Sequence, residues 1–186
     1  MLKLSWRERR LGVADVSQAG GSTAAILIDQ LTDFKTHSRA DPNAKRFMWG
    51  FTHLSDAQIE EIATYFSDQA AARGESGDRM LIDQGRTIFA SGLPDKGVAA
   101  CISCHGQHGE GAGPFPRLAG QHADYVVKQL LVYQDTEDRP RGAIMKAVCN
   151  NMSEQDMRAV AAYVEAFPPE TGMPTDKPTD RRAVHN

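Results

Sequence analysis

Hydrophobic residues recur at helical spacing in both halves of the chain. In two segments they stand at i, i+3, i+4 and i+7, first as Ile59, Ile62, Ala63 and Phe66 and again as Met157, Val160, Ala161 and Val164. This spacing places them on one stripe of a helix that packs against a core. The pattern predicts helices over about 22–36, 55–68, 121–135 and 153–166, and no segment shows the alternation expected of a strand.

Start signals stand just ahead of both stripes. Ser55 is followed by Gln58 and Ser153 by Asp156, which is the spacing of a capping box. In that arrangement the two side chains satisfy backbone N–H groups that the first helical turn leaves free. A further short helix is predicted over about 85–89. Together these features predict an all-α fold.

The two halves also resemble each other in sequence. Gly21 to Leu31 (GSTAAILIDQL) matches Gly120 to Leu130 (GQHADYVVKQL), and Phe34 then falls on Tyr133. Each half is predicted to form a helix, an irregular loop and a second helix. We therefore expect two tandem units, residues 1–75 and 76–168, joined by the small and polar stretch 67–78. Residues 169–186, rich in proline and charge, are expected to form a flexible tail.

Composition narrows the class of protein. The chain has 186 residues, 41% of them hydrophobic, and a formal net charge of -3, which suits one ordinary domain or two small ones. The charge is mixed, without a long basic run, so a nucleic acid partner is not expected. No apolar stretch approaches the roughly 20 residues of a transmembrane segment. Charges in residues 1–10 occupy the place of a secretory signal's apolar core, so no signal peptide is visible.

The chemistry of the chain is concentrated in Cys101-Ile102-Ser103-Cys104-His105, a C-x-x-C-H pattern. In this pattern two thiols bond to the vinyl groups of a haem and the adjacent histidine coordinates its iron. One helical turn places both sulfurs along one edge of the porphyrin and lets the histidine reach over its face. The third cysteine, Cys149, stands alone and is expected to be a small buried hydrophobe.

A second iron ligand is expected from a loop further along the chain. Met145 lies in the stretch 141–145, which is expected to be irregular, just before the last helix. Met152 precedes the capping serine and matches Leu54 of the first repeat, so it is expected in the core.

Other residues near the motif have weaker assignments. The carbonyl of Pro116 could accept the ring N–H of His105 and fix its orientation, although an ordinary loop proline would look the same. Packing is the expected role of His122, Tyr125 and Tyr133, which fall in the helix beside the site.

Two other kinds of site compete with the haem. Zinc could be bound by Cys101, Cys104 and His105 with either His108 or His122, because zinc prefers four sulfur or nitrogen ligands. A thioredoxin-like dithiol would need the cysteine pair between a strand and a helix. The lack of a second cysteine pair and of strand patterns favours the haem.

The surrounding sequence resembles a known family. The segments CISCHGQHGEGAGPFPRLAGQHADYVVKQL and RPRGAIMKAV, with the final amphipathic helix, resemble one domain of the tandem diheme class I cytochromes c. The first half, through GSTAAILIDQL and FMWGFTHLSDAQIEEIATYF, is similar to the other domain. The resemblance implies two class I cytochrome c-like helical domains. It also implies haem attachment at Cys101 and Cys104, with His105 and Met145 as the iron ligands.

The first unit departs from the family pattern. The repeat places Leu2, Ser5 and Trp6 where two cysteines and a histidine would stand, whereas Gly12 matches Gly111. The first domain is therefore expected to be incomplete and to lack a haem motif, with Met48 as a vestigial ligand or a core residue. A decayed diheme protein or a reading frame that begins late would explain this. The family resemblance implies a periplasmic location, because its haem is attached outside the cytoplasm.

The expected function is electron transfer through one covalently bound haem c. Iron held by both His105 and Met145 has no open position for a substrate, so the protein is expected not to be an enzyme. The implied partners are redox proteins, either a dehydrogenase or a terminal oxidase. The alternatives are a haem subunit docked to such a complex, a peroxidase-like enzyme if Met145 is not bound, and a haemless remnant.

Overall fold

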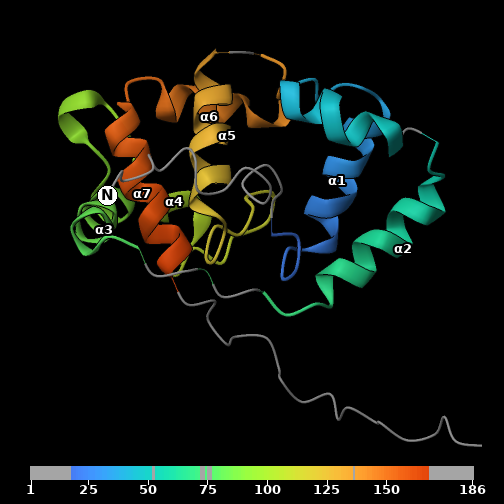
Figure 1. Ribbon diagram of the computed structural model, residues 1–186, viewed down its shortest axis with the longest axis horizontal. Coiled ribbons are helices and arrows are strands. Elements are labelled where there is room, and N and C mark those ends of the chain that lie inside the picture. Colours follow the sequence, from blue (N-terminus) through green and yellow to red (C-terminus); the bar gives the residue numbers. More distant parts are fainter. Residues whose placement is uncertain (1–17, 52, 72–73, 75–76, 136, 168–186) are drawn as a thin grey trace, which may run out of the picture.

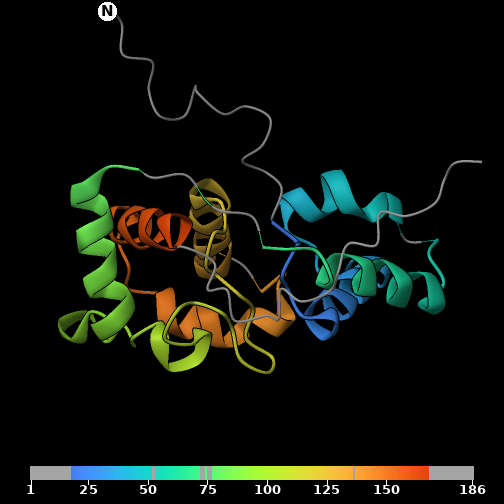
Figure 2. The ribbon, with the colours of Figure 1, turned by 90° about the horizontal axis from the view of Figure 1, so that it is seen from below.

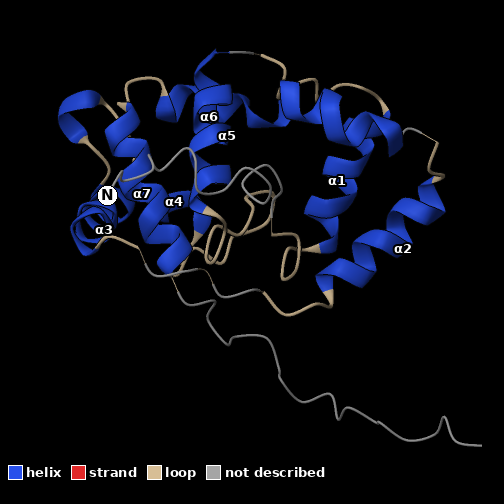
Figure 3. Cartoon of the chain, in the orientation of Figure 1, coloured by secondary structure: helices blue, strands red, loops and turns tan. Residues whose placement is uncertain are grey.

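The structure of the protein is a computed structural model that describes residues 18–51, 53–71, 74, 77–135 and 137–167. Throughout these residues the regular elements are helices, and extended pairing is limited to the bridges Leu93–Val98 and Ala112–Phe115 (Figure 3). The elements in chain order are α1 (Ala24–Lys35), η2 (Ala44–Met48), η3 (Trp49–Phe51), α2 (Asp56–Ser67), α3 (Arg79–Ser91), η4 (Pro94–Lys96), α4 (Ile102–His105), α5 (Ala123–Asp135), η5 (Pro140–Gly142), α6 (Ala143–Cys149) and α7 (Glu154–Ala166). The all-α prediction is confirmed.

These helices form two groups, which Figures 1 and 2 show side by side. In the first group, α1 packs against α2 and η3; in the second, α7 packs against α3 and α5, and α5 also contacts α6. The second group carries the C-x-x-C-H motif, which begins at the N-cap of α4 and ends with that helix. This short helix contacts α3.

The repeat seen in the sequence is also present in the backbone. The N–H of Ser22 donates to the carbonyl of Ala19 just before α1, and the N–H of Gln121 donates to that of Leu118 before α5. These two turns occupy matching places in the two repeats.

The four predicted long helices appear as α1, α2, α5 and α7, each within about two residues of the expected bounds.

Both predicted capping boxes are formed. Ser55 Oγ accepts from the N–H of Gln58 at 3.2 Å, and Gln58 Oε1 accepts from the N–H of Ser55 at 2.9 Å. At the second site, Ser153 Oγ accepts from the N–H of Asp156 at 3.2 Å, and Asp156 Oδ2 accepts in return at 2.8 Å. The local rule for helix starts thus holds in both repeats.

The main hydrophobic core lies in the second group. All four residues of the later stripe, Met157, Val160, Ala161 and Val164, are buried. Gly85 of α3 lies so close to α7 that a Cβ atom there would be 2.0 Å from the carbonyl oxygen of Ala159. Glycine at this position allows the two helices to pack closely.

The earlier stripe is only partly buried. Ile59 and Ala63 are buried, but Phe66 is 40% exposed, so the prediction that it faces a core is wrong. The physical reason is the different surroundings of the two helices: α7 lies against both α3 and α5, whereas α2 packs against α1.

Two other predictions also need correction. The stretch 141–145 is helical rather than irregular. Pro140 is the first residue of η5, and the fixed φ of a proline suits a first helical position. Helix α6 follows from Ala143. Met145 therefore lies on a helix. The short helix predicted over 85–89 is longer and begins at Arg79, where the Asp78 side chain accepts from the N–H of Met80.

Some predictions fall on residues that lie outside the described ones. These are the flexible tail 169–186, part of the linker 67–78, and the positions Leu2, Ser5, Trp6 and Gly12. None of the described helices has the length and apolar character needed to cross a membrane.

Candidate functional site

The cysteine pair is held by one short helical turn. Cys101 is the N-cap residue of α4, and its carbonyl accepts a hydrogen bond from the N–H of His105 at 3.0 Å. Gly106 ends the turn with φ at 84°, in the left-handed region that favours glycine. Cys101 and Cys104 are both half-buried free thiols. Burial raises the pKa of Cys101 to about 11, so this thiol stays protonated at neutral pH.

His105 is buried and its two ring nitrogens differ. Nδ1 lies 2.8 Å from the carbonyl oxygen of Pro116, and since a carbonyl only accepts, Nδ1 carries the proton and donates. Nε2 is buried and has no hydrogen-bond partner among the described residues. Burial also lowers the pKa of His105, which favours the neutral ring. The predicted contact with Pro116 is confirmed.

This arrangement fits a haem iron. A metal-binding histidine usually donates one ring N–H to a carbonyl or carboxylate and presents its other nitrogen to the metal. In His105 the nitrogen left over is Nε2, an orphaned polar atom in a buried place. Such an atom is costly unless something binds it.

The loop that follows the motif is folded back on itself. The N–H of Gly111 donates to the carbonyl of His105 at 2.8 Å, and the N–H of Leu118 donates to that of Gly109 at 2.7 Å. Gly111 has φ at 84°, and a Cβ there would lie 2.6 Å from the carbonyl oxygen of Phe115. These contacts bring Pro116 back beside His105.

The methionines and the third cysteine divide as follows. Met152 and Cys149 are buried in the core of the second group, as predicted. Met145 is half-buried on α6 and packs against this same core, as does Cys101. Its assignment as an iron ligand stays a prediction. Met48, at the end of η2, is half-buried.

Neither competing kind of site gains support. Within the described residues, no three or more His, Cys, Asp and Glu side chains are grouped so as to bind a metal ion, so the zinc ligands considered above are not brought together. The described part of the chain also has no strand before α4, which a thioredoxin-like dithiol would need.

The residues flanking the site do more than pack. His122 Nε2 lies 3.0 Å from Nε2 of Gln18, Tyr125 Oη accepts from Arg39 at 3.5 Å, and Tyr133 Oη accepts from Arg139 at 3.0 Å. Burial raises the pKa of Tyr133. These three residues therefore also form hydrogen bonds, in addition to the packing role expected for them.

A buried polar cluster at the junction of the two groups was missed from the sequence. Arg39 donates from Nε to Asp41 at 3.0 Å, and Arg139 Nη1 lies 3.9 Å from the same carboxylate. Arg117 donates to the carbonyls of Gln18 and Gly20. The contacts of Arg139 and Arg117 join positions far apart in the sequence, and no local pattern marks an arginine that will be buried.

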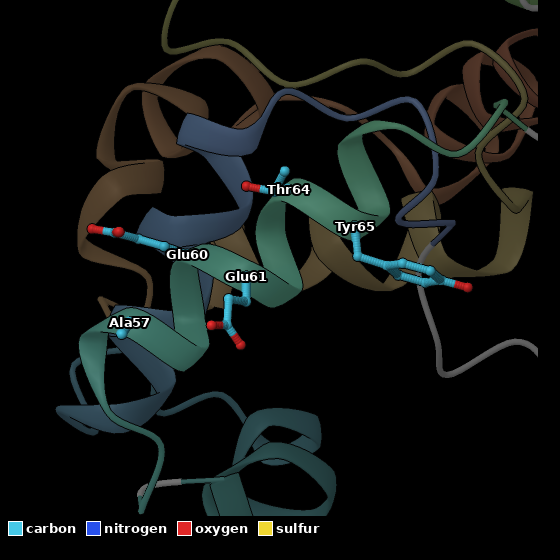
Figure 4. Close-up of a pocket in the computed structure, with 5 residues that line it drawn as sticks. All are labelled: Ala57, Glu60, Glu61, Thr64 and Tyr65. Atoms are coloured by element: carbon cyan, nitrogen blue, oxygen red, sulfur yellow. The ribbon is translucent and has the colours of Figure 1, made fainter. Parts of the chain in front are cut away.

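A shallow depression on the outside of α2 is unrelated to the motif. It is lined by exposed residues of this helix alone, Ala57, Glu60, Glu61, Thr64 and Tyr65, whose side chains spread away from one another (Figure 4). No candidate residue from the sequence lies there.

Comparison with known proteins agrees with the site. The family described as Cytochrome c matches residues 82–168. Cytochrome c4 of Stutzerimonas stutzeri is 39% identical over 158 residues, which cover 79% of this chain and 74% of that protein. This chain belongs to the cytochrome c family. Family membership implies a covalently bound haem c, and the function of this cytochrome is haem-based electron transfer.

Other relatives extend this result. Cytochrome c-552 of Acidithiobacillus ferridurans is 35% identical over 154 residues, or 82% of this chain, and the chain spans 66% of its length. A protein of Thiomonas intermedia named thiosulfate dehydrogenase electron acceptor is 32% identical, covering 83% of this chain and 72% of its own. Among solved structures, the cytochrome c4 of Acidithiobacillus ferrooxidans superposes with a TM-score of 0.77 at 35% identity, covering 82% of this chain and 89% of that one. The two-group helical architecture is thus that of the cytochromes c4.

Proposed function

We propose that this cytochrome carries single electrons on one haem, bonded to Cys101 and Cys104 and ligated by His105 and Met145. The observation that carries the proposal is the state of His105: Nδ1 donates to Pro116 while the buried Nε2 has no partner among the described residues. A haem held there would supply an iron that alternates between ferric and ferrous.

The two thiols suit covalent attachment. Each S–H adds across a vinyl C=C bond, so that a C–S bond forms and the hydrogen ends on the neighbouring carbon, with no oxidant required. Cys101 and Cys104 are free and half-buried.

We infer one haem per chain. The sequence contains a single C-x-x-C-H motif, and Leu2, Ser5 and Trp6 stand where the repeat would place another. In this proposal residues 76–168 form the haem domain, residues 1–75 form a cytochrome-like domain without covalent haem, and 169–186 form a tail. Met48 then has no iron to bind and serves as a packing residue.

The proposed redox partner is a dehydrogenase. Supporting this is the similarity to the protein named thiosulfate dehydrogenase electron acceptor. The dehydrogenase would donate electrons to the haem one at a time. Met145, as the second ligand of the iron, would leave no position for a substrate, so in this proposal the chain is a carrier and not an enzyme. The periplasm is the proposed location, because haem attachment of this kind takes place outside the cytoplasm.

The test is to count the haems. We would express the chain behind a working export signal together with haem-maturation proteins, and measure covalent haem by intact mass and by the spectrum of denatured protein. The expected result is one haem per chain, and none in the Cys101→Ala/Cys104→Ala double variant. Cys149→Ala is the matched control and should keep its haem. Absence of covalent haem in correctly exported protein would refute the proposal.

A further inference from the structure

Arg117 links the two helical groups directly beside the proposed iron ligand. It follows Pro116, whose carbonyl accepts from His105 Nδ1. Its side chain is buried, and its Nη2 donates to the carbonyl of Gly20 at 2.7 Å and to that of Gln18 at 3.2 Å. Its Nη1 donates to the carbonyl of Ala119. One guanidinium therefore ties the loop after the motif to the segment that leads into α1.

Gln121 fixes the other side of this link. Gln121 Oε1 accepts from the N–H of Gln18 at 2.8 Å, and Gln121 Nε2 donates to the carbonyl of Gln18 at 3.3 Å. The amide of this buried side chain thus pairs with the backbone of Gln18 and holds the carbonyl that Arg117 also uses. In Figure 1 the two segments meet between α5 and α1, near the centre of the molecule.

The choice of arginine is informative. Burial lowers the pKa of Arg117, because the charge is removed from water. Its two Nη atoms donate to backbone carbonyls, whereas its Nε has no partner among the described residues. A buried charge is costly unless its hydrogen bonds are satisfied. A planar guanidinium can donate to several carbonyls at fixed angles, which the ammonium group of a lysine cannot do in the same way.

We propose that Arg117 is a positioning residue for His105, holding the Pro116 carbonyl at Nδ1 so that the first helical group sets the strength of that hydrogen bond. The inference rests on the proposed function, in which His105 ligates the iron. A ring N–H held firmly by a carbonyl makes the imidazole a stronger base and a better ligand for ferric iron. Loosening the loop would therefore favour the ferrous form and raise the reduction potential.

Two variants of the haem-loaded protein test this without changing its charge. Arg117→Lys keeps the cation but loses the planar fork, and Gln121→Met removes the amide that holds Gln18. Each should raise the ferrous-to-ferric ratio at a fixed potential about three- to tenfold, which is an upward shift of about 30–60 mV for a one-electron couple. In the reduced protein, NMR should show the Nδ1 proton of His105 exchanging faster with water.

Arg141→Lys is the matched control. Arg141 joins the same two groups through Asp33, at 2.9 Å, and Asp29, at 3.2 Å, and these ion pairs do not involve the loop of Pro116. Exchange of the His105 ring proton should be unchanged in this variant. Equal acceleration in Arg141→Lys would overturn the inference, because the effect would then be general loosening of the junction.

The remaining outcomes are also decisive. If either variant loads haem and keeps the wild-type potential and proton exchange, the positioning role is refuted while the electron-transfer proposal stands. If Arg117→Lys does not fold, Gln121→Met decides on the same two measurements. Wild-type protein without covalent haem would instead refute the proposed function.

Discussion

The buried ring of His105 shows what single residues contribute to this site. Its Nδ1 is used by Pro116, and its Nε2 is left without a partner among the described residues. The C-x-x-C-H pattern alone predicts the ligand, because the histidine directly follows the second cysteine of a haem-attachment motif. The spacing cannot predict Arg117, whose acceptors Gln18 and Gly20 come from the other repeat.

Met145 and Met152 provide a matched pair of residues for testing the iron ligand. In the Met145→Ala variant, the ferric protein should lose its long-wavelength sulfur-to-iron absorption and should bind added imidazole, because the iron gains an open position. In Met152→Ala the absorption should persist. This variant should instead lose about 2–4 kcal/mol of stability, because Met152 is buried in the core and its removal leaves a cavity. The reverse pattern would assign the ligand to Met152.

The helices show how far local patterns reach at the scale of elements. Capping boxes and apolar stripes predict α1, α2, α5 and α7 because both signals lie within each helix. The pattern missed α6, since Ala143–Cys149 is only seven residues long and short helices depend on packing more than on propensity. It also placed Phe66 in a core, because a stripe shows which side of a helix is apolar and not what covers it.

The two capping boxes predict different consequences for one substitution. Ser153→Ala removes the acceptor for the N–H of Asp156 and should cost about 1 kcal/mol of unfolding free energy in denaturant titrations. Ser55→Ala is chemically the same change, but α2 packs mainly on α1. Its effect should be confined to faster hydrogen exchange in that helix. Equal loss of protection in α7 would show that the two groups unfold as one.

Asp156 gives the start of α7 a pH dependence. Burial opposes its ionisation, but hydrogen bonds from Lys96 and Ser153 outweigh this and hold the pKa of Asp156 below its usual range. A lowered carboxyl pKa stabilises the fold above the unfolded pKa, and the gain is lost as pH falls through the folded value. The stability difference between wild type and Asp156→Asn should therefore be constant near pH 6 and shrink below about pH 4. A constant difference down to pH 2 would contradict this assignment.

The arrangement of the whole molecule could be predicted only in part. The internal repeat predicts two similar units, and the two groups of helices follow it. The contacts between the groups could not be predicted, since they are polar links such as Arg141 to Asp33 and the N–H of Ala40 to the carbonyl of Asp138, at 3.0 Å. Such pairs depend on how the units dock, and a single sequence carries no signal of which distant residues will meet.

The two groups also differ in how much apolar surface they bury, and this predicts unequal stability. The buried hydrophobic residues described in the first group are Phe34, Ala44, Ile59 and Ala63, whereas the second group has a continuous core built on α3, α5 and α7. Local opening costs less where fewer apolar contacts are broken. Hydrogen exchange followed by mass spectrometry should therefore show α1 and α2 exchanging well before α3, α5 and α7. Equal protection would mean that the polar junction couples the groups fully, and that contacts with the second group stabilise the first.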